Sequence, residues 1–505
     1  MTTTSSPSHS AKSTRIRIYD QYRSANPHVV NEVVASDLCV RCGACEPACP
    51  FDIVRFGKDG YPFITDEQEC RVNCVRCLKV CPGNEIDFSR LDSEMFGQHP
   101  HPDSITGFVN GSFVAYSTNN IVREDGASGG LVTALLAYML EHDVIDGALV
   151  LGTEANGDGW QQKPFIARSV EQLCKAAKSK YLVVPMLQPL AEMEQIEGRY
   201  AVVALPCYAH ALMKYLKVSP KLRKRLKFVI GLYCNVALEP HAVDDLCEIK
   251  GVERKDLTDL QFRAGKWPGA VQASVKNSPL FKVLKNEEMK DEFNTLKLFY
   301  TPKRCNMCVD FSAEYTDIAV GDPWLRGPDG KYLYPDGYTT LLTRTDIGKQ
   351  MIVAAEQAGY IKTEPLPLST FMANFEKSAR YKRELVPEFM ELLRRRGKPV
   401  PAYHRQIGER DLTRVPLWKL RRAMKAAVLH KIAEYKWLRK FLLRLLQTPP
   451  AILYLRWNRG RKARNFAANY LKGKQLAERL QRGSTPSADP ARRDREIAMP
   501  KAEAR

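Results

Sequence analysis

The sequence lacks long hydrophobic runs. No stretch of 18 apolar residues occurs, so we expect no membrane-spanning helix. Residues 1–14 are rich in Ser and Thr and lack the apolar core of a signal peptide, so we expect a cytoplasmic protein with reduced thiols. The G-x-G-x-x-G pattern of nicotinamide-binding folds is also missing. These absences disfavour a membrane channel, a disulfide-rich secreted protein and a Rossmann dehydrogenase.

Acidic residues are scarce at the C-terminal end. Residues 401–505 contain 26 Lys and Arg but only 8 Asp and Glu, and they carry nearly all of the net charge of +19. Such asymmetry marks an appended segment with its own partner. Apolar residues recur at helical spacing within 415–445, with Lys and Arg on the other faces. We expect basic amphipathic helices that contact an anionic membrane surface, peripherally at the inner face, or an acidic protein. Nucleic acid is a third alternative, without a recognised module.

Eight of the 14 cysteines fall within 43 residues. They form two runs, C-x2-C-x2-C-x3-C and C-x3-C-x2-C-x3-C, each followed by proline: Cys39, Cys42, Cys45 and Cys49, then Cys70, Cys74, Cys77 and Cys81. This double run is typical of bacterial-type ferredoxins, which hold two 4Fe–4S clusters. Because the fourth cysteine of each run ligates the other cluster, we expect Cys81 to join the first three cysteines of the first run, and Cys49 those of the second. A pair of zinc sites is the alternative.

Four of the remaining cysteines predict a third site. Cys305 and Cys308 form an isolated C-x2-C, whereas Cys207 and Cys234 each follow a predicted strand. Because loops at the carboxyl ends of neighbouring parallel strands meet at one edge of a sheet, these four thiols can hold a third 4Fe–4S cluster. For Cys207 and Cys234 alone, a core position fits the spacing equally well. Cys174 lies on the apolar face of a predicted helix and Cys247 lies in another, and we expect both to be buried, inert thiols.

Between residues 108 and 375 predicted strands alternate with helices. The expected strands are 113–116, 146–151, 180–184, 199–205, 228–233, 316–320 and 339–343. The expected helices are 131–141, 170–178 and 209–216. This alternation indicates an α/β domain with a largely parallel or mixed sheet.

Two segments of this domain are candidates for binding phosphate. The Gly126–Gly130 loop precedes a predicted helix, where backbone amides can bind phosphate and Ser128 can add a hydroxyl. Residues 178–181 form a second polar cluster, whose lysines could balance a dinucleotide pyrophosphate. From spacing alone, an ordinary turn and a solvated helix end explain the two segments as well.

Several stretches together resemble the coenzyme F420 hydrogenase/dehydrogenase beta-subunit family. They are 126–130 with 132–136, 179–181, the Ala204-Leu-Pro-Cys-Tyr208 turn, 231–234, and 305–310 leading to 317–322. The resemblance implies a non-covalent FAD and an adjoining 4Fe–4S cluster. The FAD candidates are Ser128, Gly129, Gly130, Ser179, Lys180 and Tyr181. The implied activity is electron transfer between a two-electron carrier at FAD, either coenzyme F420 or an organic substrate, and one-electron clusters or ferredoxin.

The resemblance and the charge pattern together divide the chain into five segments. They are a disordered or extended segment (1–29), a two-cluster ferredoxin domain (30–96), a central flavoprotein domain (105–376), a basic helical extension (377–482) and a disordered tail (483–505). The expected fold is therefore a multidomain α+β and α/β protein. The alternative function is an electron-relay subunit of a larger redox complex, with another subunit as partner and no substrate of its own.

No catalytic residue follows from the sequence. His210 is a candidate proton donor, although a position on the helix surface is the simpler interpretation. Asp310 and Asp322 could shape the cluster rim or bind a ligand, or merely form turns.

Overall fold

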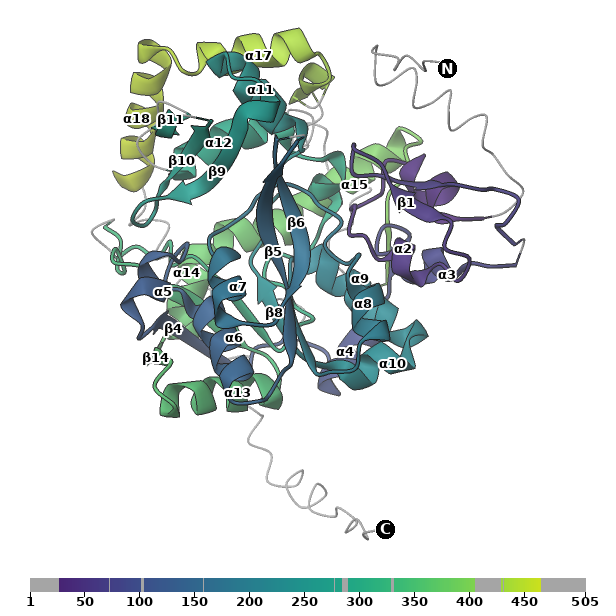
Figure 1. Cartoon of the computed structure of the whole chain (residues 1–505). Helices are drawn as coiled ribbons and strands as arrows, with labels where there is room; N and C mark the ends of the chain where they lie inside the picture. The colour runs from purple at the N-terminus through teal and green to yellow at the C-terminus, as the bar shows by residue number, and fades with distance from the viewer. Residues whose placement is uncertain are drawn as a thin grey trace, which may run out of the picture.

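The computed structural model describes residues 27–404 and 428–464, except 72, 101–103, 158, 277, 284–288, 328–330 and 430 (Figure 1). The predicted tail 483–505 and most of the predicted segment 1–29 lie outside the described residues. None of the described helices is both long and apolar enough to cross a bilayer.

An eight-stranded mixed sheet forms the centre of the molecule. Its order is β14-β4-β13-β12-β8-β7-β5-β6. The strands are β4 (Gly111–Ser117), β5 (Gly147–Asn156), β6 (Gly159–Ala167), β7 (Tyr200–Ala204), β8 (Leu226–Leu232), β12 (Ile318–Gly321), β13 (Thr339–Thr343) and β14 (Ile361–Pro365). The four central strands β5, β7, β8 and β12 are parallel to one another. Strand β6 at one end of the sheet and strands β13, β4 and β14 at the other end pair antiparallel with their neighbours. The predicted mixed sheet is confirmed.

Helices cover both faces of this sheet (Figure 1). One face packs on α6 (Leu131–Glu141), α7 (Val170–Lys175) and α13 (Asp346–Gln357), and the other on α8 (Leu190–Gln195), α9 (Pro206–Val218) and α10 (Pro220–Arg225). Successive residues of a strand face opposite sides, so Ala201 belongs to the first core and Val202 to the second. Strand β7 is apolar throughout because both of its faces are covered. The short helix α5 (Asn120–Glu124) follows β4.

The sequence missed part of this architecture. The strand expected at 180–184 makes only one bridge, from Leu182 to Leu238. Strands β6 and β14 were not expected. Neither was a separate antiparallel sheet of β9 (Leu257–Ala264), β10 (Ala270–Val275) and β11 (Ser278–Lys282). This small sheet packs against α11 (His241–Lys250) and α12 (Met289–Tyr300), and η2 (Arg254–Asp256) leads into it.

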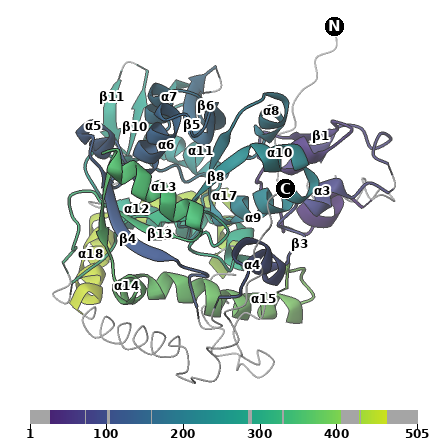
Figure 2. The ribbon, with the colours of Figure 1, turned by 90° about the horizontal axis from the view of Figure 1, so that it is seen from below.

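The cysteine-rich N-terminal module packs on the same side of the sheet as α9 (Figure 2). Its elements are η1 (Val30–Val34), α2 (Cys45–Ala48), β1 (Val54–Phe56), β2 (Pro62–Ile64), α3 (Arg76–Lys79), β3 (Glu85–Ile86) and α4 (Phe88–Phe96). A buried apolar cluster joins it to the rest of the chain, with Cys45 and Phe88 packed beside Tyr315 and Phe389. The module is therefore fixed against the central sheet.

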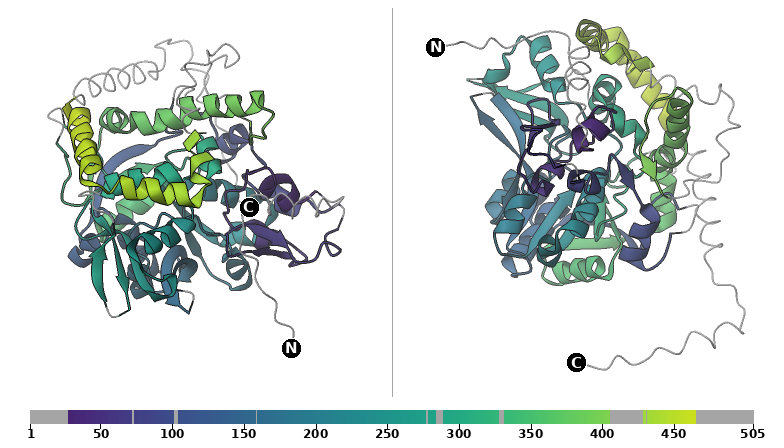
Figure 3. Two further views of the ribbon diagram at one scale, coloured as in Figure 1. Left: turned by 90° about the horizontal axis from the view of Figure 1, so that it is seen from above. Right: turned by 90° about the vertical axis from the view of Figure 1, so that its right-hand side faces the viewer.

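The chain after the sheet wraps back onto this junction. It forms α14 (Leu368–Arg380), η4 (Tyr381–Leu385), α15 (Val386–Arg395) and β15 (Ala402–Tyr403), and β15 pairs with β3 of the N-terminal module. The domain boundary expected between residues 376 and 377 falls inside α14. Two further helices, α17 (Lys436–Leu445) and α18 (Pro449–Arg464), lie beside the small sheet and its helices (Figure 3).

Candidate functional site

The first group of cysteines combines both runs. Burial and the charge of neighbouring Cys81 together raise the pKa of Cys39 to about 12. Burial and the charge of Cys81 also raise the pKa of Cys42. The pKa of Cys45 is raised by burial and by the charges of Cys42, Cys39 and Cys81. Such mutual effects require neighbouring thiols, so the structure brings together the four cysteines that the crossed pairing predicts. Their role as iron ligands remains a prediction from spacing.

The second group surrounds a small cavity. Cys49, Cys70, Cys74 and Cys77 line it together with His28. Burial, together with the charges of Cys81, Cys74 and Cys49, raises the pKa of Cys77 to about 12. Cys81 lies in the first group, so the two groups are adjacent.

The third group forms at the edge of the central sheet. Cys207 is in the first turn of α9 just after β7, Cys234 follows β8, and Cys305 lies in η3 (Lys303–Met307) with Cys308 directly after it. Burial raises the pKa of Cys207, and the charges of Cys308, Cys234, Cys305 and Cys42 raise it further. The structure therefore brings all four predicted residues together, and it places them next to the first group through Cys42.

The spacing of these thiols bears on the zinc alternative. Thiolates around a 4Fe–4S cluster stand further apart than thiolates around one ion, because irons and sulfides lie between them. Within the described part of the chain, no group of three or more His, Cys, Asp or Glu side chains could hold a single metal ion. The geometry gives zinc no support.

Cys174 and Cys247 are separate from all three groups. Cys174 is exposed on α7, and Cys247 is buried in the core beside the small sheet. Burial raises the pKa of both thiols. The position of Cys247 fits the expected buried thiol, but the expectation of a buried thiol at Cys174 was wrong, because this residue lies on the exposed side of α7.

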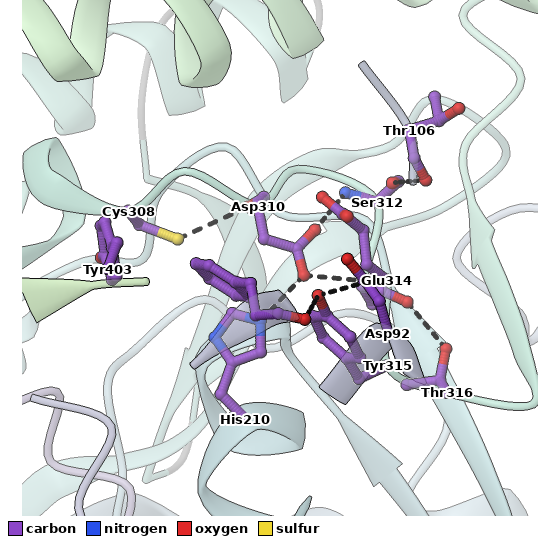
Figure 4. Close-up of polar contacts among 12 residues, drawn as sticks. Asp92, Thr106, His210, Cys308, Asp310, Ser312, Glu314, Tyr315, Thr316 and Tyr403 are labelled. Atoms are coloured by element: carbon purple, nitrogen blue, oxygen red, sulfur yellow. Dashed lines mark hydrogen bonds and ion pairs between the residues drawn. The ribbon is translucent and has the colours of Figure 1, made fainter. Parts of the chain in front are cut away.

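A buried polar network supports the loop that carries Cys308 (Figure 4). The His210 ring donates to the Asp310 carboxylate at 3.0 Å, and both side chains are buried. Although burial alone would raise the pKa of Asp310, the hydrogen bond and charge of His210 lower it to about 2. The amides of Ser312 and Glu314 donate to the same carboxylate, and the Cys308 thiol donates to the Asp310 carbonyl. The expectation of a surface histidine at 210 was wrong, because α9 turns this face toward Phe88 and Tyr315.

Two buried cations border the third group, and the sequence did not reveal either. Arg304 donates to the carbonyls of Leu38 (3.1 Å), Met307 (2.9 Å) and Pro82 (3.4 Å), so it joins η3 to the N-terminal module. Lys382 of η4 donates to the Cys305 carbonyl at 3.2 Å. The only sequence signals for these two residues were that Arg304 directly precedes the C-x2-C pair and that Lys382 follows closely after the residues of α14.

A third buried cation, Arg41, stands between two cysteines of the first run. It pairs with Glu239 of the central domain at 2.8 Å. The amide of Leu187 also donates to the Cys42 carbonyl at 2.8 Å. Contacts of this kind hold the first cysteine group against the third.

The glycine loop lies on the same sheet edge, with β13 and β12 between its strand β4 and β8. The loop leaves β4, and its Gly129 amide and Ser128 hydroxyl contact the Thr339 hydroxyl at the start of β13, both at 3.0 Å. Gly130 has a φ of 68° and precedes α6, whose N-terminus has no side-chain cap. The first amides of an uncapped helix suit an anion, so this loop could hold a phosphate group.

The second predicted flavin segment is arranged differently from expectation. The Lys180 ammonium donates to the carbonyls of Ala176 (2.5 Å), Ala177 (2.5 Å) and Lys178 (3.2 Å) at the end of α7. Burial lowers the pKa of Lys180 to about 7, so its charge is incomplete at neutral pH. Ser179 and Tyr181 flank it, and burial raises the pKa of Tyr181.

Arg263 of β9 joins the two segments, and sequence reasoning missed it. Its guanidinium pairs with both carboxylate oxygens of Asp322 at 2.8 Å. It also donates to the Ala127 carbonyl at 2.6 Å and the Tyr181 hydroxyl at 3.3 Å. Asp322 therefore holds the Arg263 side chain in place. Nothing in the sequence indicated that these two residues would pair.

Comparisons with known proteins cover most of this architecture. Residues 112–191 match the model described as "Coenzyme F420 hydrogenase/dehydrogenase, beta subunit N-term", and residues 197–368 match the model for the C terminus of the same protein. Residues 38–86 match a 4Fe–4S dicluster domain.

Relatives with curated names are oxidoreductases or their subunits. The coenzyme F420-dependent sulfite reductase of Methanocaldococcus jannaschii is 29% identical over 379 residues, which cover 70% of this chain and 52% of that protein. The coenzyme F420 hydrogenase subunit beta of Methanothermobacter thermautotrophicus is 27% identical over 57% of this chain and 96% of its own length. A subunit of the F(420)H(2) dehydrogenase of Methanosarcina mazei is 24% identical over 68% and 89%, respectively.

Among solved structures, a chain of the F420-reducing nickel–iron hydrogenase complex of Methanosarcina barkeri aligns with a TM-score of 0.44 and 22% identity, over 58% of this chain and 94% of that chain. The sequence matches carry the assignment. The chain belongs to the coenzyme F420 hydrogenase/dehydrogenase beta-subunit family and has a 4Fe–4S dicluster domain in front of the family's two conserved regions.

Proposed function

We propose that this chain is an iron–sulfur flavoprotein oxidoreductase. It exchanges electrons between a two-electron carrier, coenzyme F420 or an organic substrate, and one-electron 4Fe–4S clusters. One observation carries this proposal: the order of the sites. The glycine loop and Asp322 share a sheet edge with the third cysteine group, which adjoins the first group, which adjoins the second.

The residues around the glycine loop would hold the flavin. Gly130 and the first amides of α6 bind its phosphate, and Ser128 adds a hydroxyl, while the Gly129 amide fixes the loop by donating to Thr339. Arg263 keeps this loop against the segment of Ser179, Lys180 and Tyr181. Bound FAD supplies the chemistry that links hydride transfer to single-electron transfer. The buried His210–Asp310 pair fixes the loop after Cys308, because the Asp310 carboxylate also accepts the amides of Ser312 and Glu314.

An electron-relay subunit without its own substrate is the second candidate. Two of the relatives are named as subunits of a hydrogenase and a dehydrogenase, which favours another oxidoreductase subunit as a partner of this chain. The relay and the enzyme share every cofactor, so only turnover distinguishes them.

The test begins with full-length protein purified without oxygen. We expect about twelve irons, from three clusters of four, and one FAD per chain. The loaded chain alone should then oxidise reduced coenzyme F420 with a dye or ferredoxin as acceptor. Full loading without turnover of this or another hydride donor would favour the relay, and a colourless protein that contains zinc would contradict both candidates.

The basic extension offers a contact surface of its own. Helix α17 is docked by its inner side, where Arg439 pairs with Asp245 at 2.6 Å in the core and Leu443 is fully buried. Its outer side exposes Trp437 (70%), Phe441 (57%) and Leu445 (48%). These residues are four positions apart and therefore share one face of the helix. On α18, Leu453, Tyr454 and Trp457 are also exposed.

We propose that this surface binds an anionic membrane. Aromatic and aliphatic side chains surrounded by Lys and Arg suit the headgroup region of such a bilayer, and residues 401–505 are strongly basic. Full-length protein should sediment with phosphatidylcholine vesicles that contain phosphatidylserine. A Trp437→Ser/Phe441→Ser variant should lose this binding but keep its iron and flavin. The control is Ile121→Ser/Ile347→Ser, which changes two exposed residues on α5 and α13 and should still bind the vesicles. Failure of the wild-type protein to bind would indicate an acidic protein partner instead.

A further inference from the structure

The segment that follows the matched family regions adds one residue to the third cysteine group. The family match ends at residue 368, and Lys382 lies beyond it in η4. Only 2% of Lys382 is exposed, and its ammonium donates to the Cys305 carbonyl at 3.2 Å. The neighbouring Tyr381 hydroxyl donates to the Asn306 side chain at 3.2 Å, so η4 is held against the turn that carries Cys305.

The Lys382 ammonium lies beside the third cysteine group. It is almost fully buried and donates to the carbonyl of Cys305, a member of that group. A buried ammonium is costly unless an opposite charge compensates it. When iron is bound, the ligands of this site are thiolates, and they supply the compensating charge.

Lys382 and Arg304 differ in the cysteine groups that their hydrogen bonds reach. Arg304 donates to the carbonyls of Leu38 and Pro82, which are the sequence neighbours of Cys39 and Cys81 in the first group. Lys382 donates to the carbonyl of Cys305 in the third group. A change at Lys382 therefore addresses the third group selectively.

We propose that Lys382 is the counter-charge of the third four-cysteine site and raises its reduction potential. This inference rests on the proposed third 4Fe–4S cluster. One electron entering such a site adds one negative charge and no proton, and the electron comes from the external reductant of a titration. A fixed cation in a dry site attracts the reduced form more strongly than the oxidised form, and net charge is one of the factors that set cluster potentials.

The test compares Lys382→Met, which removes the charge with similar volume, with Lys382→Arg, which keeps it. Full-length, fully loaded protein is titrated with dithionite and mediators and followed by electron paramagnetic resonance. The signal of the third site is the one absent from a Cys305→Ala/Cys308→Ala variant. We expect reduction of this site to become about tenfold less favourable in Lys382→Met, a fall of about 59 mV for one electron. Lys382→Arg should stay close to wild type.

Lys217→Met is the matched control. This lysine lies on α9, ten residues after Cys207, but it is solvent-accessible and paired with Glu94 at 2.8 Å. Its charge is screened by water and salt, so the potential should not change. Twelve irons per chain with an unchanged potential in Lys382→Met would overturn the role of Lys382. About eight irons in the wild-type protein would instead refute the third cluster and the function built on it.

A second measurement covers the case in which Lys382→Met fails to load iron. Without iron the buried thiols are protonated, and Lys382 loses its counter-charge. Iron-free Lys382→Met should therefore melt no lower than iron-free wild type, because removal of an uncompensated buried charge is not destabilising. A lower melting temperature of the iron-free variant would show that Lys382 is only structural, which contradicts the proposal.

Discussion

The third cysteine group and the glycine loop share one sheet edge, but the cysteine groups and the predicted flavin segments are built in different ways. In the cysteine groups, the side chains that define the sequence pattern are the same atoms that meet in space. In the predicted flavin segments, the proposed binding groups are backbone amides at the start of α6, and the polar side chains already contact protein. Ser128 contacts Thr339, and Lys180 contacts the end of α7. Side-chain sites can therefore be read from spacing, whereas backbone sites depend on what the fold places around them.

The largest effect should come from the third cysteine group. The Cys305→Ala/Cys308→Ala variant removes two of four ligands, so iron should fall from about twelve to about eight per chain. The dicluster domain keeps its own eight cysteines and should keep its iron. Metal analysis of oxygen-free protein measures this. Cys174→Ala/Cys247→Ala is the control, and an equal loss of iron in both variants would remove the distinction between the third group and the isolated thiols.

The difference between side-chain sites and backbone sites also explains which parts of the candidate site could be predicted from the sequence. The crossed pairing of Cys49 and Cys81 follows from a local pattern, and the strand ends at Cys207 and Cys234 follow from apolar runs that really are buried strands. Arg263 and Lys382 could not be predicted, because their partners Asp322 and Cys305 lie 59 and 77 positions away in sequence. His210 was misplaced because its helix is buried on two sides.

The next largest effect concerns the residue that joins the flavin segments. Arg263→Met leaves the Asp322 carboxylate without its main partner and releases the Ala127 carbonyl. The loss of a charge-assisted hydrogen bond costs roughly 2 kcal/mol, so FAD affinity should weaken about thirtyfold. Titration of flavin-free protein by FAD fluorescence measures it.

Two variants make this comparison sharper. Arg263→Lys keeps the charge but loses the two-pronged contact with Asp322, so its affinity should be intermediate. Lys276→Met, in the turn after β10 of the same small sheet, removes an exposed cation and should bind FAD normally. Wild-type affinity in Arg263→Met would mean that the flavin lies elsewhere.

Ser128→Ala should have a smaller effect. The Thr339 hydroxyl accepts the Gly129 amide and can donate its own proton to Ser128, which leaves the Ser128 proton for a phosphate oxygen. Loss of one neutral hydrogen bond costs about 1 kcal/mol, or roughly fivefold in FAD affinity. Ser93→Ala on α4 is the control. Unchanged affinity together with lower stability would show that Ser128 serves only the contact with Thr339.

The smallest effect should belong to Lys180, although the sequence made it a candidate for the pyrophosphate. Its ammonium already donates to three carbonyls, so Lys180→Met should change FAD affinity less than twofold at neutral pH. The pH profile checks this independently. The pKa of Lys180 is about 7, so a direct contact with phosphate would weaken binding as pH rises from 6 to 8, because the protonated form that binds would be lost. We expect wild type and Lys180→Met to share one profile. A fall in affinity across this range that disappears in Lys180→Met would place Lys180 on the phosphate and make both flavin segments side-chain sites, like the cysteine groups.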